Sequence, residues 1–495
     1  MNDNITTSPG GIKIQRRTQV IERGDSKVIC RLFMHGSNPS RVKRVIQNIA
    51  NLSEQKTEEL LDTVLDEFSD RHKNLEKILR QHFEQMHTYV SSIEHSFNEK
   101  QELLIGAYFT MEYAIESAAL FNPSIVPHPD QSDVPEGCLR FIMSLRAVGE
   151  GHISSLVFRS GFINEKGEIK FKPISKYVTQ PDLDNPVYEK HLFTNKLDVI
   201  KGNNKISDHI LDQLSSQFTY DDLKREISTL SDEPRFPYDQ QLKSFNHLHR
   251  LAESNYQLYF DPESDISERV IFPVSEEEQG GIEDARFVRF QQEDGETIYY
   301  ATYTAFDGTD IMPQLIETED FIHFRMRTLY GKAVQDKDMA LFPRKINGYY
   351  TMLSRQDGVN NHIMFSKNLQ FWSESEIIQK PLETWELVQI GNCGSPIETS
   401  EGWLVLTHGV GPIRTYSISA ILLDLDDPTK VIGRLKQPLL KALEHQQIGY
   451  VPNVVYSCGA IVHNGQLIIP YSLSDVQPAI ARLKLSDLLT ALKKS

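Results

Sequence analysis

The sequence predicts an all-β core with a helical segment added near the N-terminus. The helical segment is indicated by residues 41–105, which contain no Gly or Pro and repeat apolar residues at helical spacing. After Phe121 the pattern changes to short β-rich runs that alternate with Gly, Asp and Asn turns. Because no long helices alternate with these runs, a doubly wound parallel sheet is not expected.

The helical segment is expected to hold two or three helices within residues 41–120, after a partly β or irregular segment at 1–40. Ser53 and the Ser69–Asp70 pair are the expected helix starts, and a third helix is expected over about 99–120. Four histidines lie in the segment, at spacings that do not share one helix face well, so solvated surface positions are expected rather than a metal site. They are His72, His82, His87 and His95.

The β-rich part covers residues 121–485, with a helical patch at about 238–254 and a C-terminal tail at 486–495. Strands are expected over 141–145, 297–303, 348–354, 403–407 and 466–471. Two segments, 318–324 and 366–372, share Ser or Thr, then Asp or Asn, then an aromatic residue four positions later. Their 48-residue separation matches one four-stranded blade, so a β-propeller is predicted. Most aromatic residues of this region are expected to pack between blades.

The amino-acid composition argues against several classes of binding partner. The 495 residues include 52 Lys and Arg against 68 Asp and Glu, which gives a net charge of −16. Such a balance argues against a duplex nucleic-acid partner and against anionic membranes. Four scattered cysteines form no disulfide framework or metal motif, and no long apolar run or signal-like start occurs. A cytoplasmic protein with reduced thiols is expected.

The stretch from 281 to 290, GIEDARFVRF, carries the most informative charges. One carboxylate of the Glu283–Asp284 pair can bind Arg286 while the other faces a cleft, and a partly desolvated Asp can serve as a general acid. The alternative is an ordinary ion pair on a surface turn.

Two cations and a histidine follow. Lys337 and Arg355 both lie beside apolar strands, which suggests an anionic ligand. The alternative is local pairing, of Lys337 with Asp336 or Asp338 and of Arg355 with Asp357. His408 ends an apolar strand before Gly409, a residue that lets a ligand approach the backbone; the alternative is a core histidine.

Taken in order, these segments resemble glycoside hydrolase family 130, the β-mannoside phosphorylases and related mannosidases. The resemblance covers about residues 118–485 and leaves the helical segment outside. Its matching pieces are 121–124 (FNPS), 144–146 (SLR), 281–286 (GIEDAR), Lys337–Asp338, Phe342–Pro343, Arg355, Trp403, His408–Gly409 and Asp475. The resemblance implies a five-bladed β-propeller with the active site in its central depression.

The resemblance also implies an inverting enzyme in which Asp284 protonates the glycosidic oxygen through the sugar 3-hydroxyl. Phosphate then attacks the anomeric carbon and gives α-mannose 1-phosphate. The family's phosphate-binding positions correspond to Arg146, Lys337, Arg355 and His408, although Arg140 could take the place of Arg146. The implied sugar-binding residues are Asn122, Asp338, Asp475, Tyr303, Glu283 and Arg286.

Two departures from the family pattern bear on the reaction. Ala285 replaces the usual Pro, and Gln389 replaces a Lys that many phosphorylases carry. Phosphorolysis of β-1,2- or β-1,4-mannosides is still favoured over hydrolysis, and a non-catalytic glycan-binding protein is the third interpretation. Inorganic phosphate is the expected co-substrate, with no metal or organic cofactor. The helical segment is expected to mediate homo-oligomer formation or to act as a lid.

Overall fold

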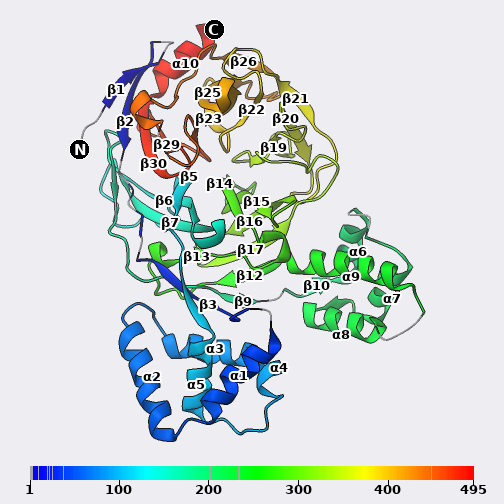
Figure 1. Ribbon diagram of the computed structural model, residues 1–495. Helices are drawn as coiled ribbons and strands as arrows, with labels where there is room; N and C mark the ends of the chain where they lie inside the picture. The colour runs from blue at the N-terminus through cyan, green and yellow to red at the C-terminus, as the bar shows by residue number, and fades with distance from the viewer. Residues whose placement is uncertain are drawn as a thin grey trace.

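The computed structural model describes residues 4–8, 11–18, 21, 23–24, 26–36, 38–184, 186–199, 202–231, 235–447 and 449–494 (Figure 1). Sheets form the main body, and two groups of helices project from it (Figure 1). Within the described residues, every helix is too short or too polar to cross a membrane.

The first helical group contains α1 (Pro39–Ala50), α2 (Glu54–Phe68), α3 (Leu75–Gln85), α4 (His87–Val90) and α5 (Glu99–Tyr108). Ser53 caps α2 by accepting a hydrogen bond from the Lys56 amide, as predicted. The helix start at Ser69–Asp70 is wrong, because Ser69 ends α2 and α3 begins only at Leu75. The helix predicted over 99–120 is also too long. It ends at Tyr108, and the chain continues as β4 (Thr110–Ala114), which pairs with β3 (Val28–Leu32).

Two histidines of this group are buried, contrary to expectation. The ring of His72 bonds the Glu112 carboxylate at 2.7 Å, and that of His82 bonds the Thr110 hydroxyl at 2.6 Å. Burial lowers the pKa of His82 to about 4, so this ring is neutral near pH 7. Helical spacing identified the segment, but it did not reveal that β4, paired with β3, supplies the partners of these two rings. His87 and His95 are exposed, as expected.

The second helical group is larger than the predicted patch. It contains α6 (Lys190–Val199), α7 (Lys205–Gln213), α8 (Tyr220–Ser231) and α9 (Tyr238–Glu253), and only α9 was expected. These helices bury a small core of their own, which includes Phe193, Leu211 and Leu248. Residues 485–494, expected mainly as a tail, form α10 (Leu485–Lys494), because Leu488 and Leu492 are buried in the same apolar cluster as Leu422 and Leu483.

The described strands of the main body fall into five groups of mostly antiparallel strands. The first is β5 (Ala119–Pro127), β6 (Leu139–Val148), β7 (Ser154–Ile163), β8 (Ile169–Phe171) and β13 (Val270–Ile271). The second is β14 (Gly281–Gln291), β15 (Thr297–Phe306), β16 (Ile311–Thr318), β17 (His323–Thr328), β12 (Tyr256–Tyr259) and β9 (Asp182–Asp184). One parallel residue pair, Gly281 with Ser154, joins these two groups.

The remaining three groups follow in chain order. The third is β18 (Ala340–Leu341), β19 (Tyr350–Ser354), β20 (Asn361–Ser366) and β21 (Glu376–Gln379). The fourth is β22 (Gln389–Asn392), β23 (Ile397–Thr399), β24 (Gly402–Gly411), β25 (Thr415–Leu423) and β26 (Val431–Arg434). The fifth is β27 (Val455–Tyr456), β28 (Ile461–His463), β29 (Gln466–Leu473) and β30 (Gln477–Lys484), extended by β1 (Asn4–Thr7) and β2 (Lys13–Thr18). All five segments predicted as strands lie largely within strands.

The repeated Ser/Thr-x-Asp/Asn segments lie at equivalent places. One connects β16 to β17, and the other connects β20 to β21. In both, the hydroxyl and the Asp or Asn side chain accept backbone N–H bonds that close the turn. Phe324 and Trp372, the aromatic residues of the pattern, are fully buried between neighbouring groups. The predicted repeat is therefore a structural unit of the body.

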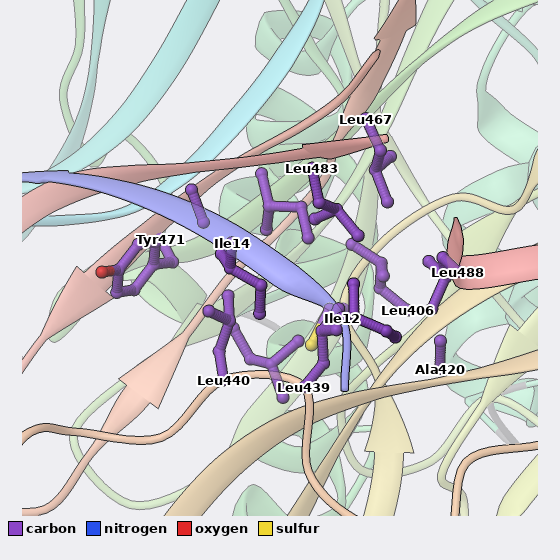
Figure 2. Packing of buried hydrophobic residues seen from close by; sticks show 14 of the residues in the cluster. Ile12, Ile14, Leu406, Ala420, Leu439, Leu440, Leu467, Tyr471, Leu483 and Leu488 are labelled. Atoms are coloured by element: carbon purple, nitrogen blue, oxygen red, sulfur yellow. The ribbon is translucent and has the colours of Figure 1, made fainter. Parts of the chain in front are cut away.

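Apolar side chains fill the spaces between successive groups. Trp403 packs with Phe342 and Leu353 between the third and fourth groups. Figure 2 shows the cluster between the fourth and fifth groups, where Ile12 and Ile14 from the N-terminal end of the chain meet Leu406 and Tyr471. The packing role expected for most aromatic residues is confirmed for these side chains.

The inner strands also contact one another around the centre. The Phe287 amide donates to the Ser124 hydroxyl at 3.0 Å, which links the first and second groups. The Gln291 amide donates to the Pro343 carbonyl at 2.8 Å and links the second and third. The Asn392 side chain bonds the Asp338 carbonyl, and the Cys458 amide donates to the Pro123 carbonyl at 3.0 Å. The fifth group therefore contacts the first.

Candidate active site

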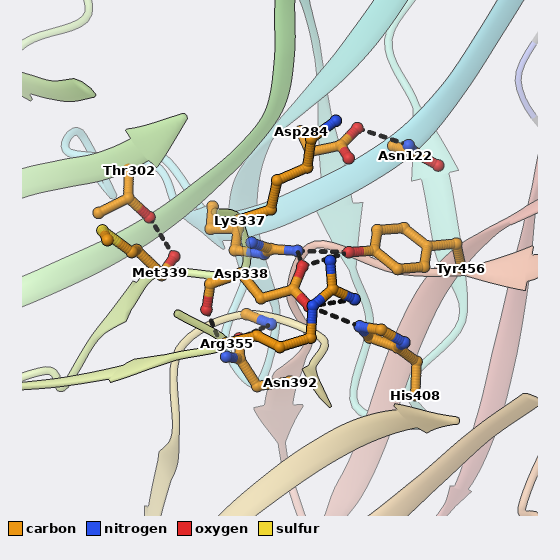
Figure 3. A network of polar contacts seen from close by, with 12 residues as sticks. Asn122, Asp284, Thr302, Lys337, Asp338, Met339, Arg355, Asn392, His408 and Tyr456 are labelled. Atoms are coloured by element: carbon orange, nitrogen blue, oxygen red, sulfur yellow. Dashed lines mark hydrogen bonds and ion pairs between the residues drawn. The ribbon is translucent and has the colours of Figure 1, made fainter. Parts of the chain in front are cut away.

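The candidate site is a network of polar side chains that come from several of the strand groups (Figure 3). Its key acidic and amide residues have left-handed backbones, a conformation that Asn and Asp tolerate better than most residues. They are Asn122 (φ 49°), Asp284 (φ 53°), Asp338 (φ 67°) and Asp475 (φ 54°). On β5 and β14 these residues sit in register shifts, and such bulges redirect a side chain out of the regular ladder.

Asp284 is held by a residue from the first group. Its Oδ1 accepts a hydrogen bond from the Asn122 side-chain amide at 2.6 Å. The Arg146 guanidinium lies 3.6 Å from the same oxygen. The Asp284 side chain is 15% exposed, so the carboxyl group is largely enclosed but still accessible. This is the environment that a proton donor to a bound sugar requires.

Glu283 bridges two of the predicted cations. Its Oε1 accepts from Arg146 at 2.6 Å, and its Oε2 accepts from Lys337 at 2.6 Å. Burial by itself would lower the pKa of Arg146, but the surrounding carboxylates raise it. The prediction that one carboxylate of the 283–284 pair binds Arg286 is wrong. The local alternative for Lys337 is wrong as well, because its partner comes from the neighbouring group.

Asp338 is the centre of a second set of contacts. Its Oδ1 accepts from Arg286 at 2.7 Å and from the Tyr456 hydroxyl at 2.9 Å. Its Oδ2 lies 2.8 Å from His408 Nε2 and 3.1 Å from Arg355. Burial would raise the pKa of Asp338, but the charges of Arg355 and Arg286, together with the hydrogen bond from His408, hold it well below its usual value. Asp338 is therefore a buried carboxylate that organises its neighbours.

His408 is completely buried beside Asp338. Burial lowers its pKa, which favours the neutral ring, and a neutral ring bonded to Asp338 through Nε2 carries its proton there. Nδ1 is then an acceptor, and it is buried without a hydrogen-bond partner among the residues that the structure describes. Gly391 permits the close packing, since a Cβ there would lie 2.3 Å from Asp338 Oδ2.

Arg355 approaches two carboxylates. It lies 3.3 Å from Asp336 and 3.1 Å from Asp338. The local partner considered from the sequence, Asp357, instead lies 3.0 Å from His362. Both cations that the sequence placed beside apolar strands, Lys337 and Arg355, thus belong to the central network.

Asp475 lies close enough to Asp284, Arg146 and Arg414 for their charges to act on it. Burial is the main cause that raises its pKa to about 6, and the charge of Asp284 raises it further. Two other candidates lie elsewhere. Tyr303 is buried, and its hydroxyl donates to Glu278 at 2.7 Å. Arg140 binds Asp130 at 2.8 Å, so Arg146 is the arginine of the network.

Sequence reasoning gave no role to three residues of the network. Tyr456 bonds Asp338, the Ser472 hydroxyl donates to Asn122 Oδ1 at 2.8 Å, and Asn392 bonds the Asp338 carbonyl. A signal for Asn392 was present, because Asn or Asp recurs at the inner strands of the first four groups. Ser472 carries no comparable signal, since a serine in a strand is ordinary. Among the described residues, no cluster of His, Cys, Asp and Glu could hold a metal ion.

Comparison with known proteins identifies the class. Residues 255–494 match the glycoside hydrolase family 130 model, described as beta-1,4-mannooligosaccharide phosphorylase. A 1,2-beta-oligomannan phosphorylase of Thermoanaerobacter sp. (strain X514) is 37% identical over 230 residues, which cover 45% of this chain and 75% of that protein. The chain therefore belongs to glycoside hydrolase family 130.

Further similar proteins carry related names. A beta-1,2-mannobiose phosphorylase of Listeria innocua serovar 6a is 32% identical over 231 residues, 45% of this chain and 63% of that protein. The solved beta-1,2-mannobiose complex of a Listeria innocua phosphorylase aligns with a TM-score of 0.46 and 24% identity, covering 77% of this chain and 94% of the other.

Proposed function

We propose that this protein is an inverting β-mannoside phosphorylase that converts short β-1,2- or β-1,4-mannosides and phosphate into α-mannose 1-phosphate and a shortened acceptor. The observation that carries the proposal is the enclosed Asp284, bonded to Asn122 and flanked by cations from different strand groups. The names of the relatives agree with it, since they include phosphorylases of β-1,2-oligomannan, β-1,2-mannobiose and β-1,4-mannooligosaccharide.

Asp284 is the proposed proton donor, and it acts on the glycosidic oxygen through the sugar 3-hydroxyl. Asn122, Glu283 and Asp475 are the proposed partners of the sugar hydroxyls, because all three are polar and lie around Asp284. Asp338 and Arg286 are more buried, at 2% and 3% exposure, so they act by fixing their neighbours. Tyr303 is excluded from this role by its buried contact with Glu278.

Phosphate is proposed to bind at Arg146, Lys337, Arg355 and His408. Because Nε2 of His408 is bonded to Asp338, this ring can donate to phosphate only through Nδ1, which must then carry a second proton. Each of the four residues bonds a carboxylate in the structure, so phosphate must compete with those carboxylates or share the cations with them. Lys337 has the most exposed side chain of the network's cations, at 32%, and a flexible stem that can turn toward an anion. Charge-assisted hydrogen bonds from fixed cations orient phosphate for in-line attack.

The architecture proposed for this chemistry is a five-bladed β-propeller, with each strand group as one blade. Three observations support this architecture. Successive strand groups contact one another, the fifth group contacts the first, and β2 pairs with β30. The pairing of β2 with β30 joins the beginning of the chain to the last group. Residues 41–120 are proposed as a helical subdomain added to residues 121–485, where it mediates self-association or covers the site. A reducing cytoplasmic location is part of the proposal, supported by four free cysteines.

Hydrolysis is the second candidate, and Asp475 favours it. A water-using inverting enzyme needs a second carboxyl group as base, and Asp475 is a partly enclosed carboxyl group within the electrostatic reach of Asp284. Gln389 also favours hydrolysis, because it stands where many phosphorylases carry a Lys. Against this, the network holds several cations, which water does not require.

The deciding experiment incubates the protein with β-1,2- and β-1,4-mannobiose, with and without inorganic phosphate. Phosphorus NMR should detect α-mannose 1-phosphate only with phosphate, and Asp284→Asn should abolish it. Mannose released equally well without phosphate would establish the hydrolase instead. No turnover in either direction of the reaction would leave only a glycan-binding role.

A further inference from the structure

An exposed aromatic pair stands at the rim of the site. The rings of Tyr450 and His152 lie 5.8 Å apart with 31° between their planes. Tyr450 is 74% exposed, and His152 is exposed as well. The two rings come from different strand groups, since His152 lies between β6 and β7 and Tyr450 precedes β27. Such a pair presents aromatic surface to solvent that a ligand could cover.

This pair is next to the catalytic centre. The Val451 amide, one residue beyond Tyr450, donates to the Ser474 carbonyl at 3.1 Å. Ser474 immediately precedes Asp475. On the other side of Asp475, the Val476 carbonyl accepts from the Leu120 amide at 3.1 Å, two residues before Asn122. The Tyr450 segment is therefore bonded to the turn that carries Asp475, and this turn is bonded to β5, which carries Asn122.

The tip of the β24–β25 hairpin borders the same rim. The Tyr416 amide donates to the Asn453 carbonyl at 3.1 Å, which ties this hairpin to the segment that carries Tyr450. At the tip, Ile413 and Arg414 both have left-handed backbones, at φ 54° and 50°, and Ile413 is 88% exposed. A β-branched residue in this conformation is strained, and strain of this kind concentrates at ligand-binding positions.

The equivalent turn in the first group shows that the strain is avoidable. Between β6 and β7, Gly151 (φ 68°) and His152 (φ 60°) adopt the same pair of left-handed conformations, after a glycine with a similar backbone. At the β24–β25 tip the same positions hold Ile413 and Arg414, after Gly411. Glycine removes the strain at one turn, whereas the other turn keeps an exposed isoleucine.

We propose that Tyr450, His152 and the Ile413–Arg414 tip form the subsite that binds the acceptor sugar, on the leaving-group side of the β-mannoside. Aromatic rings stack on the apolar face of a pyranose, and the guanidinium donates to its hydroxyls. The leaving-group side is assigned because the opposite end of the network, at Asp338 and His408, is fully enclosed. A chain of sugars can extend only toward the rim. This inference rests on the proposed function.

The test uses the synthetic direction, in which α-mannose 1-phosphate is the donor and β-1,2- or β-1,4-mannobiose is the acceptor. Tyr450→Ala should raise the KM for the acceptor about tenfold and leave the KM for the donor within twofold. Tyr238→Ala removes a tyrosine that is 78% exposed at the start of α9, and it should change neither KM. An unchanged acceptor KM in Tyr450→Ala, or a shift in the donor KM instead, would overturn the assignment.

A binding measurement separates this inference from the proposed reaction. Titration calorimetry of β-1,2- and β-1,4-mannotriose against Asp284→Asn and against Asp284→Asn/Tyr450→Ala requires no turnover. A loss of affinity of about fivefold or more in the double variant supports the subsite even if the wild-type protein forms no mannose 1-phosphate. Equal affinities, or no binding of either trisaccharide to Asp284→Asn, would refute it.

Discussion

The side-chain amide of Asn122 donates a 2.6 Å hydrogen bond to Oδ1 of Asp284, although 162 residues separate them in the chain. The orientation of the Asn122 side-chain amide is fixed by a second hydrogen bond, in which the Ser472 hydroxyl donates to Asn122 Oδ1 at 2.8 Å. Asp284 Oδ1 must therefore act as an acceptor, and a proton carried by Asp284 lies on Oδ2. Asn122 in this way determines which carboxyl oxygen can deliver a proton.

Asn122→Asp should lower kcat/KM for β-mannobiose about 100-fold. The new side chain cannot donate to Asp284 when ionised, and it adds a like charge beside it; a hydrogen bond to a charged group contributes about 1.5–3 kcal/mol. Steady-state kinetics with both linkages measures the loss. Asn368→Asp is the control, since Asn368 uses only its side-chain oxygen, to accept the Gln370 amide in an exposed turn. A loss below threefold in Asn122→Asp would contradict this role.

Lys337→Met should raise the KM for phosphate at least tenfold, with a smaller effect on the KM for the mannoside. Methionine keeps much of the apolar stem but removes the charge that pairs with Glu283 and that we assign to phosphate. Phosphate titrations at saturating mannoside give the value. Lys345→Met is the matched control, because Lys345 is also paired with a carboxylate, Glu293 at 2.9 Å, but belongs to no part of the network. Equal phosphate dependence in both variants would count against phosphate binding by Lys337.

Asp475 should make stability depend on pH in a particular direction. Its pKa is about 6 in the folded protein and near 3.8 in an unfolded chain, so the folded state retains a proton that the unfolded state has released. Stability should therefore fall as pH rises from about 4 to about 6 and stay lowered above that, by about 3 kcal/mol.

Asp475→Asn removes this titration. Thermal unfolding of both proteins at pH 4 and pH 7 should show the variant gaining stability relative to wild type at the higher pH. Asp426→Asn, a change at an exposed turn, should show no such gain. A gap between Asp475→Asn and wild type that stays constant with pH would mean that Asp475 titrates at its ordinary pKa.

The sequence predicted most residues of the central polar network but not the partners that they bond. The 281–286 motif, Lys337, Arg355 and His408 were recognisable because charged or ionisable residues stood at unusual places beside apolar strands. Which charged residues form ion pairs depends on how neighbouring strand groups pack together. Arg286 binds Asp338 and Glu283 binds Lys337, so each local interpretation failed once the groups packed side by side.

In the fold as well, features with a local sequence signal were predicted, whereas features that depend on long-range packing were not. Period-two strands and the Ser/Thr-x-Asp/Asn turns are local signals, and both were read correctly from the sequence. Helices α6, α7 and α8 were missed because they are short, with 10, 9 and 12 residues, and they are stabilised by a core that they share with α9. The burial of His72 and His82 likewise depends on the pairing of β3 with β4, which joins residues more than 70 positions apart.

The strained tip of the β24–β25 hairpin gives a final prediction, in which stability and activity move in opposite directions. Ile413→Asn should raise the melting temperature by about one or two degrees, because Asn tolerates the left-handed backbone and a β-branched residue does not. The same variant should raise the acceptor KM severalfold, since it removes an exposed apolar side chain from the proposed subsite. Ile432→Asn is the control: Ile432 is 46% exposed on β26, where Asn is disfavoured, so this variant should melt at the same or a lower temperature. If Ile413→Asn melted lower than wild type, the isoleucine would be contributing to the fold. If it melted higher with an unchanged acceptor KM, the strain would have no part in sugar binding.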